Sequence, residues 1–119
     1  MLKKNNYANI LNDGLLFHER RSFRRVPVNI DARFAYSNMF YAGMIANLSE
    51  TGMFINTRQS LPIGTNLVVM IHDGSELIKV FAEIQRVENS HKYSDGIGVK
   101  LVSPSEDYLG LVEDIKTTD

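Results

Sequence analysis

The sequence of 119 residues contains no cysteine, which excludes disulfides, thiolate nucleophiles and thiolate metal sites. It also has no apolar run that approaches the roughly 20 residues that a membrane-spanning helix needs. Lys3 and Lys4 stand near the N-terminus, but the apolar segment of a secretory signal does not follow them. We therefore expect a cytoplasmic protein of one domain that makes no contact with a membrane.

The chain also has no excess of basic charge, since its formal net charge is -1 at pH 7. A β-barrel that binds RNA or single-stranded DNA would need cations and aromatic rings spread over one face. Here the cations are most concentrated at Arg20, Arg21, Arg24 and Arg25, whereas the segment 104–119 is mainly acidic. We therefore expect no nucleic-acid polymer as a partner. A small anionic ligand suits the forked donors of the arginine cluster better, and a solvated linker is the alternative explanation of the cluster.

Sequence signatures of catalysis are missing as well. His18, His72 and His91 lie far apart and lack the spacing of metal ligands. The chain has no Ser/His/Asp signature and no glycine-rich phosphate loop ahead of a helix. We therefore expect a protein that is not an enzyme and that holds neither a metal nor a cofactor.

Alternating apolar residues predict a β-domain. Between 26 and 36 every even position is Val, Ile, Ala, Phe or Tyr, which is the period of a half-buried strand. Val87 is out of step with Ile84, which predicts either a bulge or the end of the strand, and a polar loop is expected at 89–95. Similar patterns, separated by turns at Ser37-Asn38 and Asp73-Gly74, predict further strands at 39–47, 53–55, 66–72, 76–88 and 96–102.

The second predicted strand, 39–47, is apolar on both faces, and we interpret its even positions as the inner ones. In that interpretation Asn47 and Ser49 project outward at the end of the strand. Gly52 then allows a positive φ in the turn that follows. Asn, Ser, Thr and Gly are also ordinary turn formers, so this segment taken alone has a purely structural explanation.

The segment after the last strand predicts a helix. Residues 103–106, Ser-Pro-Ser-Glu, have the spacing of a capping box with proline at the first helical position. Tyr108, Leu111, Val112 and Ile115 follow with the spacing of one apolar helical stripe. Six strands and a helix predict an all-β fold, a small antiparallel barrel with the C-terminal helix packed on it.

Two short motifs resemble the PilZ domain family. They are Arg21-x-x-x-Arg25 and, after one strand, Asn47-x-Ser49-x-x-Gly52, which are similar in type and spacing to that family's RxxxR arm and [D/N]xSxxG turn. The flanking residues at 19–28 and the last strand at 96–101 are also similar to the family. On this basis the chain divides into an N-terminal tail at 1–18, a PilZ β-barrel domain with its arm at 19–103, and the helix at 104–119.

The resemblance implies a six-stranded antiparallel PilZ-type β-barrel with a flexible N-terminal arginine arm that binds the bacterial second messenger cyclic di-GMP. It implies that Arg21 and Arg25 bind phosphate and the O6/N7 edge of guanine. Asn47 and Ser49 would form hydrogen bonds with guanine and nearby ligand groups. Gly52 would keep the turn tight enough for close approach. Asn47 stands where aspartate is commoner in the family.

Two further arginines acquire an expected role from the resemblance. An arginine at the position of Arg20 is associated in the family with two stacked, intercalated ligand molecules, so we expect a ligand dimer. Arg86 ends a strand where the family often places a side chain that stacks on guanine, although a solvated strand-end arginine is an equally simple explanation. Arg24 adds charge or faces solvent.

The resemblance therefore implies a cyclic di-GMP receptor, a monomer or weak dimer, that signals to an unidentified output protein when its arm rearranges. The alternative is a PilZ-like protein-interaction module that binds no nucleotide, for instance in pilus or motility machinery. Modules of that kind typically lack the arginine arm. The presence of Arg21 and Arg25 favours the receptor.

Overall fold

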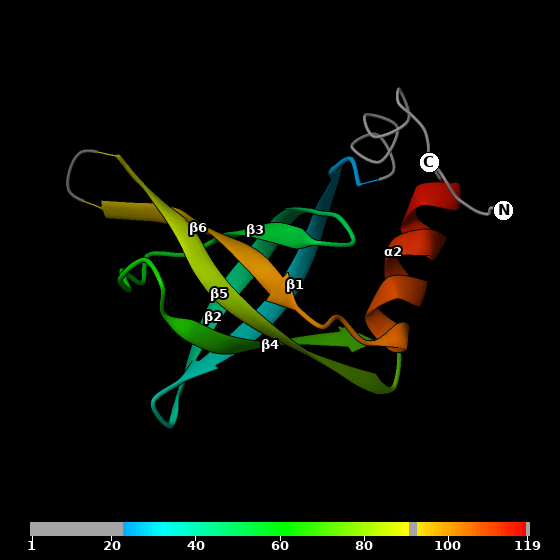
Figure 1. Cartoon of the computed structure of the whole chain (residues 1–119), viewed down its shortest axis with the longest axis horizontal. Helices are drawn as coiled ribbons and strands as arrows, with labels where there is room; N and C mark the ends of the chain where they lie inside the picture. The colour runs from blue at the N-terminus through cyan, green and yellow to red at the C-terminus, as the bar shows by residue number, and fades with distance from the viewer. Residues whose placement is uncertain (1–22, 91–92, 119) are drawn as a thin grey trace, which may run out of the picture.

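The computed structural model describes residues 23–90 and 93–118, so the predicted tail and Arg20 and Arg21 lie outside the described residues. Six antiparallel strands form a closed barrel in the order β1-β2-β3-β6-β5-β4, and helix α2 lies beside it (Figure 1). The predicted all-β barrel with a C-terminal helix is confirmed. The elements are β1 (Val26–Tyr36), β2 (Met39–Leu48), β3 (Gly52–Asn56), β4 (Asn66–Asp73), β5 (Glu76–Ser90), β6 (Tyr93–Val102) and α2 (Glu106–Thr118).

Tight turns join the strands largely where the sequence predicts them. Ser37 and Asn38 connect β1 and β2 with positive φ values of 54° and 65°, as a two-residue hairpin turn requires. Between β4 and β5 the turn is one residue later than predicted, because Asp73 pairs with Glu76 and leaves Gly74 at the first central position. Strand β5 extends to residue 90, and β6 begins at residue 93. The predicted loop at 89–95 is therefore mostly strand.

The inner face of β2 differs from our interpretation. Phe40, which we placed inside, is 64% exposed, whereas Ile45 is completely buried. A bulge between Ile45 and Asn47 then shifts the register, so that Leu48 is buried after all. Ser49, directly after β2, is also buried, with only 1% of the residue exposed. The exposed position that we expected for Ser49 at the end of the strand is therefore wrong.

The inner residues of the other strands follow the predicted alternation. In β5 the inward run ends at Ile84, and a register shift between Ile84 and Arg86 confirms the bulge that Val87 predicted. Burial of these side chains out of water provides the main stabilisation of the barrel. The core consists of Ala32, Phe34, Ile45, Leu48, Met53, Ile55, Leu67, Val69, Ile71, Ile78, Val80, Ala82, Ile84, Ile97, Val99, Leu101, Tyr108 and Val112.

Helix α2 supplies the last two core residues, Tyr108 and Val112. Its predicted apolar stripe is confirmed, but its cap is not the predicted one. Ser105 Oγ accepts a hydrogen bond of 3.2 Å from the backbone N–H of Tyr108, so Ser105, rather than Ser103, caps the helix. Within residues 23–90 and 93–118, no helix combines the length and the apolar character needed to cross a membrane.

Candidate functional site

The barrel brings the arm and the polar turn together. Arg25 lies directly before β1, and Asn47 lies near the end of β2, where it is the cross-strand partner of Pro27. Arg25 Nη1 donates a hydrogen bond of 2.9 Å to Asn47 Oδ1. The two motifs that the sequence singles out are therefore in direct contact at one end of the β1–β2 pair.

The turn after β2 is held by its own polar atoms and by helix α2. Ser49 N donates to the carbonyl of Gly52 at 2.9 Å, and Thr51 N donates to Ser49 Oγ at 3.2 Å. The hydroxyl of Tyr108 donates a buried hydrogen bond of 2.7 Å to the carbonyl of Ser49. In this structure Ser49 shapes the turn, and its buried backbone links the turn to the helix.

A second contact joins the same turn to the helix. Lys116 Nζ lies 2.9 Å from Glu50 Oε2, and both side chains are largely covered. Burial, followed by the nearby carboxylate of Glu50, raises the pKa of Tyr108 well above its usual range. Tyr108 therefore keeps its proton, and its hydrogen bond to Ser49, over the whole physiological pH range.

Gly52 is needed for close approach rather than for a special backbone angle. It does not have the positive φ that we predicted, since Gly64 and Gly74 are the glycines with that conformation among the described residues. A Cβ atom at position 52 would lie 2.8 Å from the carbonyl oxygen of Val99 and 2.9 Å from Arg25 Nη2. The absent side chain leaves the space in which the Arg25 guanidinium lies.

Arg86 approaches the same region from β5. It pairs across the strands with Gly98, where an added Cβ would lie only 2.9 Å from Arg86 Cγ. Its guanidinium carbon lies 5.3 Å from the centre of the Phe54 ring, in cation–π contact. An ion pair of 3.3 Å with Glu88 is exposed, so it restrains the side chain only weakly.

A small cavity of about 320 Å³ lies between these side chains. Burial, and secondly repulsion from Arg86, lower the pKa of Arg25. Cations held near one another in this way favour an anionic ligand, which relieves the repulsion. The cavity is lined by Arg25, Thr51, Gln85, Arg86, Gly98, Val99 and Lys100.

Of the residues that the sequence singled out, Arg25 and Arg86 line the cavity, and Asn47 and Gly52 lie beside Arg25. Lys100 in the cavity wall was not among the predicted ligand residues. Lys100 is the cross-strand partner of Gly52. The alternating pattern of the last strand indicates that the Lys100 side chain points outward from the barrel. Only the register between strands shows that Lys100 lies opposite Gly52. The structure does not place Arg20 or Arg21, which lie outside the described ranges.

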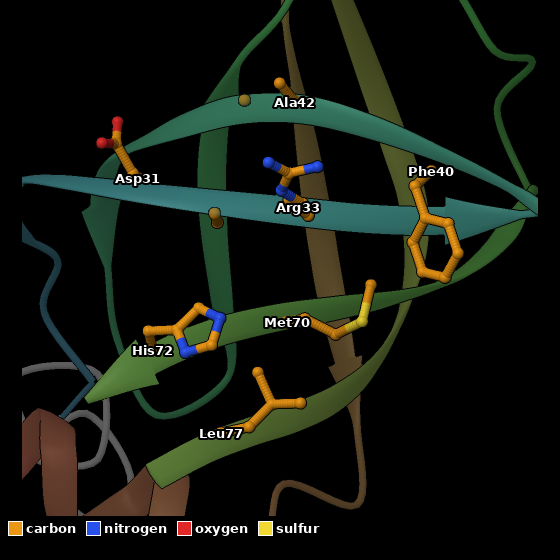
Figure 2. Close-up of a pocket in the computed structure, with 9 residues that line it drawn as sticks. Asp31, Arg33, Phe40, Ala42, Met70, His72 and Leu77 are labelled. Atoms are coloured by element: carbon orange, nitrogen blue, oxygen red, sulfur yellow. The ribbon is translucent and has the colours of Figure 1, made fainter. Parts of the chain in front are cut away.

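A larger hollow of about 780 Å³ lies on the outer face of β1, β2 and β4 (Figure 2). Its wall contains Asp31 and Arg33 together with apolar side chains such as Phe40 and Met70. Of the predicted ligand residues that the structure describes, none lines it, and its charged groups are of both signs. We therefore place the candidate site at the smaller cavity, where several cations and polar groups converge. Within the described residues, no cluster of His, Asp or Glu suits a metal ion.

The fold defines a small closed β-barrel with one helix packed against its core. A family model of the PilZ domain matches residues 19–115, so the chain belongs to the PilZ family, a family of cyclic di-GMP receptors. This confirms the resemblance seen in the sequence.

Solved structures agree with this fold. One similar structure is the inhibitor of motility (MotI/DgrA) of Bacillus subtilis, with a TM-score of 0.67 and 15% identity over 84% of this chain. The chain spans 53% of the length of that protein. Another is the PilZ domain of CeSA from a cellulose-synthesizing bacterium, with a TM-score of 0.59 and 17% identity over 77% of this chain and 93% of that one. A search of curated proteins by sequence finds no significant match.

Proposed function

We propose that this PilZ domain is a receptor for cyclic di-GMP that binds through Arg21, Arg25, Asn47, Ser49 and Gly52. One observation carries the proposal for this chain. Arg25, which belongs to the arm motif, donates a hydrogen bond to Asn47 of the turn motif. Arg25 also lines the cavity together with Arg86. Guanidinium groups match phosphate oxygens and the O6/N7 edge of guanine. The convergence therefore suits a ligand with two phosphates and two purine bases.

Binding requires an exchange of hydrogen-bond partners. In the structure the side-chain oxygen of Asn47 accepts from Arg25. An amide has one acceptor oxygen, and the N1–H and N2–H donors of guanine compete for it. Cyclic di-GMP would therefore draw Arg25 from Asn47 to a phosphate or to the guanine edge. The movement of Arg25 would reposition the arm that precedes β1, and this rearrangement is the proposed signal to an unidentified output protein.

Arg86 is proposed to cover one guanine. Its guanidinium already lies over an aromatic ring, that of Phe54, and its side chain packs closely over Gly98, which has no Cβ to obstruct it. A planar guanidinium stacks on a purine as it does on a phenyl ring. Arg20 is proposed to neutralise part of the charge of a second, intercalated ligand molecule, which gives two ligands per chain.

Isothermal titration of cyclic di-GMP tests these proposals. We expect binding at micromolar ligand, with about 10- to 100-fold loss of affinity for Arg21→Ala and for Arg25→Ala, because each variant removes charged hydrogen bonds. Arg33→Ala is the matched control, since it removes an exposed arginine from the larger hollow and is expected to bind like the wild type.

The titration also separates the alternatives. Wild-type protein that gives no heat would support the protein-interaction module that binds no nucleotide. A stoichiometry of one ligand per chain would refute the ligand dimer while leaving the receptor proposal intact. Arg20→Ala is expected to lower the stoichiometry from two ligands to one, and an unchanged value of two would remove Arg20 from that role.

A further inference from the structure

A continuous apolar row crosses the outside of the barrel. Its members are cross-strand neighbours: Phe40 pairs with Ala35, Ala35 with Val68, Val68 with Phe81, and Phe81 with Val102. The row thus runs over β2, β1, β4, β5 and β6. Phe40 is 64% exposed and Phe81 is 61% exposed. Contiguous exposed apolar surface of this kind marks an interaction site on most soluble proteins.

The row has a definite shape. Phe40 and Phe81 stand on two sides of a hollow of about 380 Å³ whose lining includes Ala35 and Val68. Phe40 also forms one end of the larger hollow, beside Arg33 and Met70 (Figure 2). The two phenyl rings therefore project as ridges above a floor of smaller side chains. A partner surface that covers these two exposed rings must itself carry apolar side chains.

Charges of opposite sign flank the row on β5. Lys79 precedes Phe81 by two residues and Glu83 follows it by two, so all three side chains lie on the outer face. Neither Lys79 nor Glu83 forms an ion pair within the part of the chain that the structure describes. One edge of the apolar row on this strand is therefore cationic and the other is anionic.

We propose that this row is a self-association surface, and that its occupant is a second copy of the chain. A two-fold axis along the row places Phe81 of one copy against Phe81 of the other. The same rotation exchanges the two edges, so Lys79 of each copy faces Glu83 of the other. Such an isologous contact forms two reciprocal ion pairs around an apolar centre.

The proposed interface leaves the candidate ligand site open. Arg25, Asn47 and Arg86 are not members of the row or of its two charged edges. Glu83, at one edge of the row, pairs across the strands with Lys100, which lines the ligand cavity. A dimer of this kind therefore displays two ligand sites, and its formation does not depend on whether cyclic di-GMP binds.

Sedimentation equilibrium of the full chain, without added nucleotide, tests the proposal. We expect a concentration-dependent monomer–dimer equilibrium for the wild type and monomers for Phe81→Glu. Lys79→Glu and Glu83→Lys each place like charges opposite one another twice, so each is expected to weaken the dimer by about tenfold. The double variant Lys79→Glu/Glu83→Lys restores both pairs with reversed polarity and is expected to dimerise like the wild type.

Ile63→Glu is the matched control, because Ile63 is 66% exposed and lies outside the row. It is expected to leave the association constant unchanged. Circular dichroism of each variant establishes that the barrel is folded, and Phe40→Ser provides a second, milder disruption of the row. A wild type that stays monomeric at high micromolar concentration overturns the proposal. A dimer that Phe81→Glu leaves intact, or that the charge swap fails to restore, overturns it equally.

Discussion

Arg25 and Asn47, 22 positions apart in the sequence, are joined by a hydrogen bond of 2.9 Å between Nη1 and Oδ1. The bond satisfies the single acceptor oxygen of the Asn47 side chain from within the protein. A guanine base that binds beside Asn47 has to compete with Arg25 for that oxygen. The proposed receptor is thus held in its ligand-free arrangement by a contact between its two recognition motifs.

Asn47→Asp is expected to tighten cyclic di-GMP binding. A carboxylate has two acceptor oxygens, so it can accept from guanine N1–H and N2–H while it remains near Arg25. Charge-assisted hydrogen bonds exceed neutral ones by about 1 kcal/mol, which corresponds to roughly five- to tenfold in affinity. Isothermal titration measures the change. Asn56→Asp makes the same substitution at an exposed position of β3 and should have no effect. Weaker binding by Asn47→Asp would show that its ion pair with Arg25 dominates.

Gly52→Ala is expected to weaken ligand binding by about tenfold or more, because the new methyl group displaces the Arg25 guanidinium from its place 2.9 Å away. It also meets the carbonyl of Val99, so we expect a loss of about 1–3 kcal/mol in the free energy of unfolding. Titration and urea denaturation measure the two effects. Gly110→Ala in α2 meets nothing within 4 Å and should stabilise the protein by about 0.5–1 kcal/mol without affecting affinity. Equal behaviour of the two variants would contradict the role of Gly52.

Arg86→Lys tests stacking separately from charge. Lysine keeps the positive charge but loses the planar group that lies over Phe54 and is proposed to cover a guanine. We expect about three- to tenfold weaker binding for Arg86→Lys and a larger loss for Arg86→Ala. Arg33→Lys, the same change outside the site, should bind normally. Full affinity in Arg86→Lys would mean that Arg86 contributes charge alone.

Tyr108→Phe is expected to destabilise the fold by about 1–3 kcal/mol, since it leaves the buried carbonyl of Ser49 without its 2.7 Å donor. The shift of the urea midpoint at constant slope measures this loss. Tyr36→Phe, at an exposed tyrosine, serves as the comparison and should change stability by less than about 0.5 kcal/mol. If Tyr108→Phe leaves the urea midpoint unchanged, the hydrogen bond makes no net contribution to the free energy of unfolding.

The stability of the wild type is expected to fall in alkaline solution through Tyr108. Burial, and secondly Glu50, raise the pKa of Tyr108 in the folded protein above the value of about 10 for an unfolded chain. The folded state therefore retains a proton that the unfolded state releases. The stabilisation is complete below about pH 10 and is lost as the pH rises further. Unfolding free energies measured between pH 9 and 11 should decline less steeply for Tyr108→Phe than for the wild type.

Local sequence patterns were sufficient for much of this molecule. The period of two in 26–36 and 96–102 identified strands and their inner residues, because each residue on a strand alternates sides regardless of what the strand pairs with. The stripe that includes Tyr108 and Val112 identified the helix in the same way. The spacing of the arginine and Asn-x-Ser motifs pointed to the family, which the comparison with the PilZ domain bears out.

Other features depend on contacts between distant segments. The even-position interpretation of 39–47 failed because both faces are apolar, and only the pairing of this strand with β1 and β3 decides which one enters the core. The hydrogen bonds from Tyr108 to Ser49 and from Arg25 to Asn47 likewise join segments that are far apart in the sequence. The approach of Arg86 to Gly98 and the alignment of Phe40 with Phe81 follow from barrel register, a long-range property of all six strands. Sequence alone determined the elements and the motif residues, whereas tertiary pairing decided what those residues face.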